Sequence, residues 1–134
     1  MSKASYVWVR KPHGPIPKAV QESLRARLTK HVRTKWEGRC REVVIRFRGA
    51  YVYIDAFPGD VEYLPDTSPE EGAILDATPV HLCRLGYLGS VGLWGYAFFT
   101  YSNERYESSL VASGSFEATP EEAFDCSAGV YLGG

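Results

Sequence analysis

Residues 43–55 read VVIRFRGAYVYID, and this stretch decides the fold class. Apolar and polar side chains alternate on both sides of a central Arg-Gly-Ala, which is the period of half-buried strands around a turn. The pattern predicts a β-hairpin with its valines, isoleucines and phenylalanine on one face. Four side chains would share the hairpin's opposite face: Arg46, Arg48, Tyr51 and Tyr53.

A basic amphipathic helix is predicted before the hairpin. Pro17 suits the first turn of a helix, and the helical pattern continues to about Trp36. Lysines and arginines occupy most of its circumference, so we expect the remaining apolar side to face the core. The apolar stripe consists of Val20, Leu24, Leu28, Val32 and Trp36.

The chain after the hairpin predicts more strands and a closing helix. Residues 58–79 form an acidic, proline-rich loop, in which residues 68–71 (SPEE) match a capping box for a short helical turn. Residues 119–122 (TPEE) are a second capping box and predict a helix reaching about Leu132. Strand patterns cover residues 80–88, 93–101 and 106–112, with a possible first strand at residues 6–9.

Together these elements predict one α+β domain over residues 1–134. The strands would form an antiparallel meandering sheet of about five strands, with the N-terminal basic helix and the C-terminal helix packed on one face. The sheet's other face would be open to water or to a partner. A chain of 134 residues, 45% of them hydrophobic, needs no metal or disulfide to build such a core.

Neither a signal peptide nor a transmembrane segment is predicted. The longest near-apolar run, residues 91–99, is far shorter than the roughly 20 residues needed to span a bilayer. The three cysteines form no CxxC pair and leave one unmatched, which is typical of a reducing compartment. We therefore expect a cytoplasmic protein without a membrane partner.

The net charge of −1 hides a strong division along the chain. Residues 1–48 contain 13 lysines and arginines and three glutamates, a net charge of +10, whereas the remainder has two arginines and 13 carboxylates, a net charge of −11. Basic surfaces most often meet nucleic acid, acidic partners or membrane headgroups. Alternatively, the two halves neutralise each other within the fold or across a homodimer.

The hairpin's polar face is the strongest candidate binding site. Its guanidinium groups would hold phosphates while its phenol rings stack on unpaired bases, and the basic helix would add phosphate contacts. An ordinary solvated face with cross-strand Arg–Tyr pairs is the alternative interpretation. The candidate nucleic-acid-binding residues are Arg25, Lys30, Arg33, Arg46, Arg48, Tyr51 and Tyr53.

Catalytic and metal-binding patterns are incomplete. The three histidines, His13, His31 and His81, fall in no recognised catalytic spacing. His81 and Cys83 are two residues apart on a predicted strand and would share a face, but two ligands do not make a zinc site. We therefore expect no catalytic residues, no metal and no cofactor.

Cys40 is a weaker candidate for reactivity. Its neighbours Arg39 and Arg41 would favour the thiolate and lower the thiol pKa. Against this, most free cysteines are inert packing residues.

The sequence thus favours a small non-catalytic binding or regulatory protein that acts through its basic helix, its sheet face or both, on nucleic acid or on another protein. A protein-partner inhibitor using its acidic loop is one alternative. A small enzyme whose site assembles only in the fold is another. A pocket that joins a histidine to carboxylates would favour catalysis, and a flat basic face would favour binding.

Overall fold

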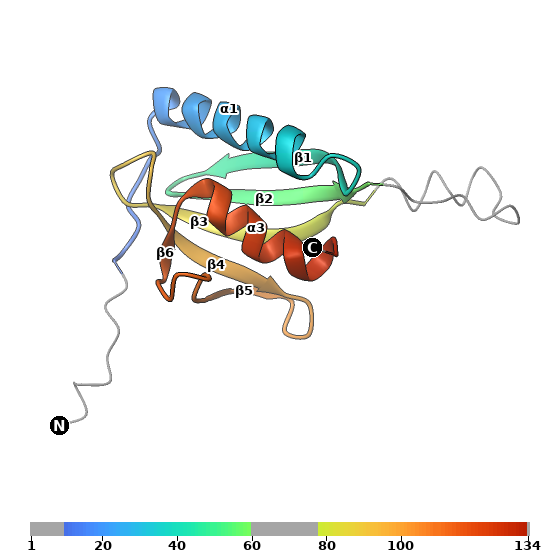
Figure 1. The fold of residues 1–134 in the computed structure, drawn as a ribbon. Helices are drawn as coiled ribbons and strands as arrows, with labels where there is room; N and C mark the ends of the chain where they lie inside the picture. The colour runs from blue at the N-terminus through green and yellow to red at the C-terminus, as the bar shows by residue number, and fades with distance from the viewer. Residues whose placement is uncertain (1–9, 60–77, 134) are drawn as a thin grey trace, which may run out of the picture.

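The computed structural model describes residues 10–59 and 78–133. Within them the chain forms an antiparallel sheet with two helices, α1 and α3, on the same face (Figure 1). The strands follow the order β1-β2-β3-β4-β5, and the short β6 also pairs with β4. The predicted α+β class, the meandering sheet and the placement of the helices are confirmed.

The predicted hairpin consists of β1 (Cys40–Arg48) and β2 (Tyr51–Pro58). The chain turns at Gly49, whose φ of 59° is a left-handed conformation that glycine adopts at little cost. Val52 and Ile54 of β2 are fully buried and alternate with the half-buried Tyr51 and Tyr53, as the pattern predicts. The predicted strand at residues 6–9 and the greater part of the acidic loop, residues 60–77 with their predicted helical turn, lie outside the described residues.

The remaining strands are β3 (Val80–Tyr87), β4 (Trp94–Thr100), β5 (Arg105–Ser108) and β6 (Glu117–Ala118). β5 ends four residues earlier than predicted, because the chain turns back there. The Val111 N–H donates to the Ser115 carbonyl at 2.9 Å. This turn brings β6 against β4. A strand of two residues is too short to be recognised from the sequence, so this pairing was not predicted.

Both helices form where the sequence predicts them. The helix α1 (Lys18–Lys35) buries Leu24, Leu28 and Val32 of its apolar stripe. The helix α3 (Pro120–Tyr131) begins with a side-chain cap, in which Thr119 Oγ1 accepts a hydrogen bond from the Glu122 N–H at 3.1 Å.

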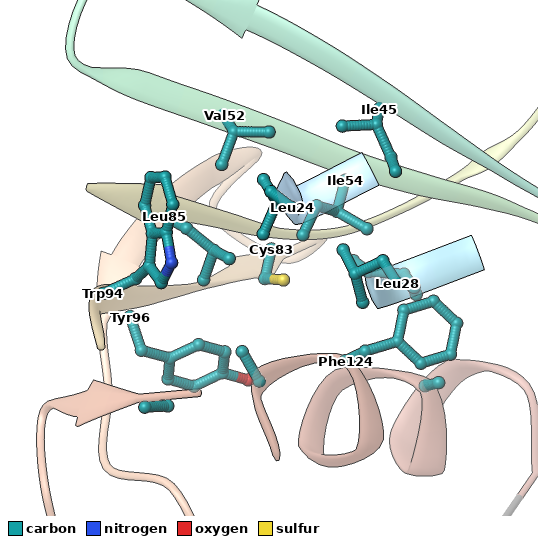
Figure 2. Packing of buried hydrophobic residues seen from close by; sticks show 14 of the residues in the cluster. Leu24, Leu28, Ile45, Val52, Ile54, Cys83, Leu85, Trp94, Tyr96 and Phe124 are labelled. Carbon is teal, nitrogen blue, oxygen red and sulfur yellow. The ribbon is translucent and has the colours of Figure 1, made fainter. Parts of the chain in front are cut away.

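The core lies between the helices and one face of the sheet. Figure 2 shows Leu24 and Leu28 of α1 and Phe124 of α3 packed against the buried strand residues Ile54 and Leu85. Both helices of the described residues are on this side, and none of those residues forms a helix over the opposite side of the sheet, called here the open face (Figure 1). Among residues 10–59 and 78–133, no helix has the length and apolar character required to cross a membrane.

The segment before α1, residues 10–17, crosses one end of the sheet and is called here the N-terminal strap. The His13 N–H donates to the Tyr87 carbonyl at 3.2 Å. Arg10 forms two hydrogen bonds with the Glu117 carboxylate, at 2.7 and 2.8 Å. Pro12 lies so close to Gly86 that a Cβ added there would be 3.0 Å from Pro12 Cβ and closer still to Pro12 Cγ. The strap therefore requires glycine at position 86.

Candidate binding surface on the open face

The hairpin places four of the predicted site residues together on the open face. Arg46 is opposite Tyr53 in the β1–β2 register, and Arg48 is opposite Tyr51. The Arg46 guanidinium lies 5.5 Å from the centroid of the Tyr53 ring. The two tyrosines are half-buried, so part of each ring remains accessible.

The three predicted helix residues lie on the other side of the sheet. Arg25 stacks over Phe47, 5.5 Å from the ring centroid, and donates a weak 3.4 Å hydrogen bond to the Ile45 carbonyl. Lys30 and Arg33 are exposed on α1. Because α1 covers the face that carries the hairpin's apolar side chains, the helix and the open face form two separate basic surfaces instead of one.

Part of the basic half of the chain is neutralised within the fold. Arg27 makes a two-point ion pair with Glu121 of α3, at 2.7 and 3.0 Å. His31 Nε2 lies 2.7 Å from the Asp125 carboxylate, which also accepts a hydrogen bond from Trp36. Together with the strap's pairing to Glu117, these contacts join the two halves of opposite charge, as the alternative interpretation of the charge division predicts.

Two residues that the sequence did not single out complete the open-face group. Arg84 of β3 lies with its guanidinium 4.2 Å from the Tyr51 ring centroid and 5.7 Å from that of Tyr106 on β5. Tyr106 in turn makes an edge-to-face contact with Tyr53, at 5.3 Å between centroids. We call Arg46, Arg48, Tyr51, Tyr53, Arg84 and Tyr106 the arginine–tyrosine face.

Only strand pairing could have revealed Arg84. It is one of two arginines in the acidic part of the chain, and it reaches the site because β3 pairs with β2 across residues 59–79, with Arg84 opposite Tyr53. Tyr106 arrives through β5, where it is opposite Phe99. Burial, and then the nearby Asp55 carboxylate, raise the pKa of Tyr106 to about 12. The Tyr106 phenol is therefore uncharged at physiological pH and does not repel an anionic ligand.

A buried carboxylate organises one side of this group. Asp55 is only 2% exposed, and its two oxygens lie 2.9 Å from His81 Nδ1 and 3.1 Å from Arg46 Nη2. The contact orients the His81 ring and holds Arg46 near the sheet. A pocket that joins a histidine to a carboxylate is the feature that would favour an enzyme. Neither His81–Asp55 nor His31–Asp125 borders the pocket described below.

His81 and Cys83 lie on opposite faces, so the prediction that they share one is wrong. The β2–β3 register shifts between Ile54 and Asp55, where Leu82 is inserted as a bulge. The bulge reverses the alternation, so Cys83 enters the core (Figure 2) while His81 contacts Asp55 on the open face. No cluster of three or more potential metal ligands occurs within residues 10–59 and 78–133.

Cys40 is not an activated thiol, contrary to the interpretation of its arginine neighbours. Burial raises its pKa, and its Sγ donates to the Glu42 carbonyl at 3.5 Å. Arg39 stacks on the Trp36 ring, 4.2 Å from the centroid, and Arg41 lies over Phe57. Both guanidinium groups are thus engaged elsewhere.

A small pocket opens on the same face beside Arg84. Its floor is the backbone of β3 and β4 at Gly86, Gly95 and Ala97, where the side chains are absent or small. Its volume is about 70 Å³. The surrounding residues are Arg84, Tyr51 and Ser108, together with Arg10 and Pro12 of the strap.

Arg84 lines this pocket, called here the Arg84 pocket, and its side chain carries an unsatisfied donor. Its Nε is buried and has no hydrogen-bond partner among the described residues. Within the same residues no carboxylate forms an ion pair with Arg84. A buried N–H without a partner is rare in folded proteins and requires an explanation.

Comparison with protein-family models, with curated proteins and with solved structures found no match. Functional inference therefore depends on the geometry of the chain itself.

Proposed function

We propose that this chain is a non-catalytic binding protein that holds single-stranded nucleic acid on its arginine–tyrosine face. The observation that carries the proposal is the joint presence of three arginines and three tyrosines on the open face, opposite the side where both described helices pack. Arginines supply contacts to phosphates, and aromatic rings on a sheet supply stacking surfaces for unpaired bases. In keeping with the cysteine pattern, we place this activity in the cytoplasm.

The contacts within the group support a preformed site. Arg84 is held between Tyr51 and Tyr106, and Arg46 is held by the buried Asp55. Side chains that are already ordered lose less conformational freedom when a ligand binds. The helix α1 offers a second, separate basic surface through Arg25, Lys30 and Arg33. In the part of the chain that the structure describes, Arg25 contacts one aromatic ring, Phe47, whereas the open face combines three tyrosines, so we expect α1 to contribute less.

Two matched double variants test which surface binds. Arg46→Gln with Arg48→Gln removes two charges from the open face, and Lys30→Gln with Arg33→Gln removes two from α1. Fluorescence anisotropy with labelled single-stranded RNA, single-stranded DNA and duplex DNA, at low and physiological salt, gives affinity and salt slope. Loss of two phosphate contacts lowers the slope for a single strand by about 1.4. We expect this loss for the open-face variant only.

Other results would redirect the proposal. Equal losses in both variants would indicate non-specific electrostatic binding to the whole surface. Absence of binding at low salt would refute the nucleic-acid proposal and favour a protein partner, whether bound through the acidic loop or as a second copy of the chain in a homodimer. Sedimentation at two salt concentrations separates those cases, since a dimer of opposed charges dissociates as salt increases.

A small enzyme is the second candidate, and the His81–Asp55 pair is the observation that favours it. A carboxylate that orients an imidazole is a common arrangement for a general base. The same RNA samples show whether strands are cleaved. Cleavage that disappears with His81→Gln, while binding persists, would replace the binding proposal by a catalytic one.

A further inference from the structure

The Arg84 pocket has the size and charge of a site for one oxyanion. We propose that it binds a phosphate monoester group: inorganic phosphate, the phosphate of a mononucleotide, or the phosphorylated 5′ end of a single strand. The last form rests on the proposed function, whereas binding of the free anion does not.

The charges of the residues around the pocket favour an anionic ligand. Arg10, the other cation at the pocket, is already neutralised by its two hydrogen bonds with Glu117. Arg84 has no such countercharge among the described residues, and its buried Nε lacks an acceptor. A phosphate in the pocket would supply the missing countercharge to the guanidinium, and hydrogen bonds between guanidinium and phosphate are among the strongest in proteins. Ser108 and Tyr51 add hydroxyl groups to the same pocket.

Rigidity makes Arg84 a suitable anion ligand. Its guanidinium is packed between the rings of Tyr51 and Tyr106, and its backbone belongs to an interior strand, paired with β2 on one side and β4 on the other. The donor is thus held in place before the ligand arrives, which lowers the entropic cost of binding.

The volume of the Arg84 pocket favours a terminal phosphate group. A volume of about 70 Å³ accommodates several waters or one phosphate, but not a nucleoside. Pro12 and Arg10 of the strap border the pocket on one side, and the strands form its floor. A terminal phosphate brings one substituent to the pocket mouth, while a phosphate within a strand brings two, so the small volume fits the terminal group better. The base of a bound nucleotide would remain outside, beside the tyrosines.

Two variants probe the pocket without removing its walls. Gly95→Ala projects a methyl group from the floor, and the added Cβ meets nothing nearer than the Gly86 carbonyl oxygen at 3.9 Å, so the strand tolerates it. Arg84→Lys keeps the charge and removes the Nε donor. Arg105→Lys, at an arginine of β5 whose side chain is 71% exposed and does not line the pocket, is the matched control.

The first arm of the test titrates inorganic phosphate, with chloride as the reference anion, and follows ¹H–¹⁵N spectra. The reporters are the Arg84 Nε–H and the amides of Gly86 and Gly95. We expect saturable shifts at these signals, with affinity weakened at least about tenfold by Gly95→Ala and by Arg84→Lys and unchanged in Arg105→Lys. No shift at millimolar phosphate, or shifts that persist in both pocket variants, would overturn the proposal.

The second arm compares one oligonucleotide with a 5′-phosphate or a 5′-hydroxyl end. Tighter binding of the phosphorylated form, lost in Gly95→Ala, would assign the pocket to strand ends. Equal binding of both forms, with inorganic phosphate still in the pocket, would assign it to free phosphate or nucleotide. If neither oligonucleotide binds but phosphate does, the proposed function fails while the pocket assignment stands.

Discussion

Gly86→Ala and Gly95→Ala make a matched pair, because the two glycines are direct cross-strand partners on β3 and β4. A Cβ at position 86 would be 3.0 Å from Pro12 Cβ and still closer to Pro12 Cγ. A Cβ at position 95 would have the Gly86 carbonyl oxygen as its nearest non-adjacent neighbour, at an ordinary 3.9 Å. Neither glycine has a positive φ, so the backbone itself tolerates alanine at both positions.

The expected change in the free energy of unfolding of each variant follows from how its new methyl group packs. Carbon atoms pack at about 3.5–4.0 Å, so Gly86→Ala must displace the N-terminal strap by roughly 1 Å or more. The strap is attached by the His13–Tyr87 hydrogen bond and by the two bonds from Arg10 to Glu117. Overpacking of this kind costs about 1–3 kcal/mol. Gly95→Ala avoids it and gains up to about 0.5–1 kcal/mol from replacing a strand glycine.

Urea unfolding gives the two free energies of unfolding, and we expect Gly86→Ala to be less stable than Gly95→Ala by about 1–3 kcal/mol, because the gain from replacing a strand glycine is common to both. Amide exchange locates the change, since the His13 N–H should lose protection in Gly86→Ala alone. Equal stabilities together with an unchanged His13 signal would show that the strap does not lie against β3, and would also remove one side of the Arg84 pocket.

Three further predictions concern α3 and the cysteines. Thr119→Ala removes the α3 cap and should lower the free energy of unfolding by about 1 kcal/mol; an unchanged urea midpoint would contradict the cap. Burial raises the pKa of Glu121, but hydrogen bonds from Arg27 outweigh it and leave the pKa below the ordinary value of 4.5. That stabilisation is therefore present at neutral pH and lost as pH falls below 4.5 through the folded-state pKa, so Arg27→Gln should destabilise the protein at pH 7 and much less at pH 3 in urea titrations. Cys126 is half-exposed, so thiol labelling followed by mass spectrometry should modify it before the two buried cysteines, and the reverse order would contradict the packing.

Local patterns in the sequence predicted most of the fold. The alternation of residues 43–55 determines which hairpin side chains are buried, and the four-residue repeat does the same for α1. The TPEE capping box marked the start of α3 to within a residue. These features depend on neighbours close in sequence, which is why one sequence suffices to find them.

The features that the sequence could not supply are non-local or irregular. Arg84 joins the site only because β3 pairs with β2 across a long loop. The bulge at Leu82 adds one residue to a strand. As a result, Cys83 faces the core and His81 faces the opposite side, although two residues spaced by two would share a face in a regular strand. No periodicity rule predicts where such an insertion falls.

The separation of the two basic surfaces was nevertheless implicit in the sequence. The apolar stripe of α1 must bury itself against the apolar face of the hairpin, where Ile45 and Phe47 point. Arg46 and Arg48 alternate with those residues, so they must point away from α1. A net charge of +10 over residues 1–48 therefore says little about binding, because the fold divides it between two sides and neutralises part of it against α3 and β6. What distinguishes the open face is the combination of arginines with tyrosines and an unsatisfied donor. Two variants that remove the same number of charges, one from the open face and the other from α1, therefore test the proposed function more directly than any change in overall charge.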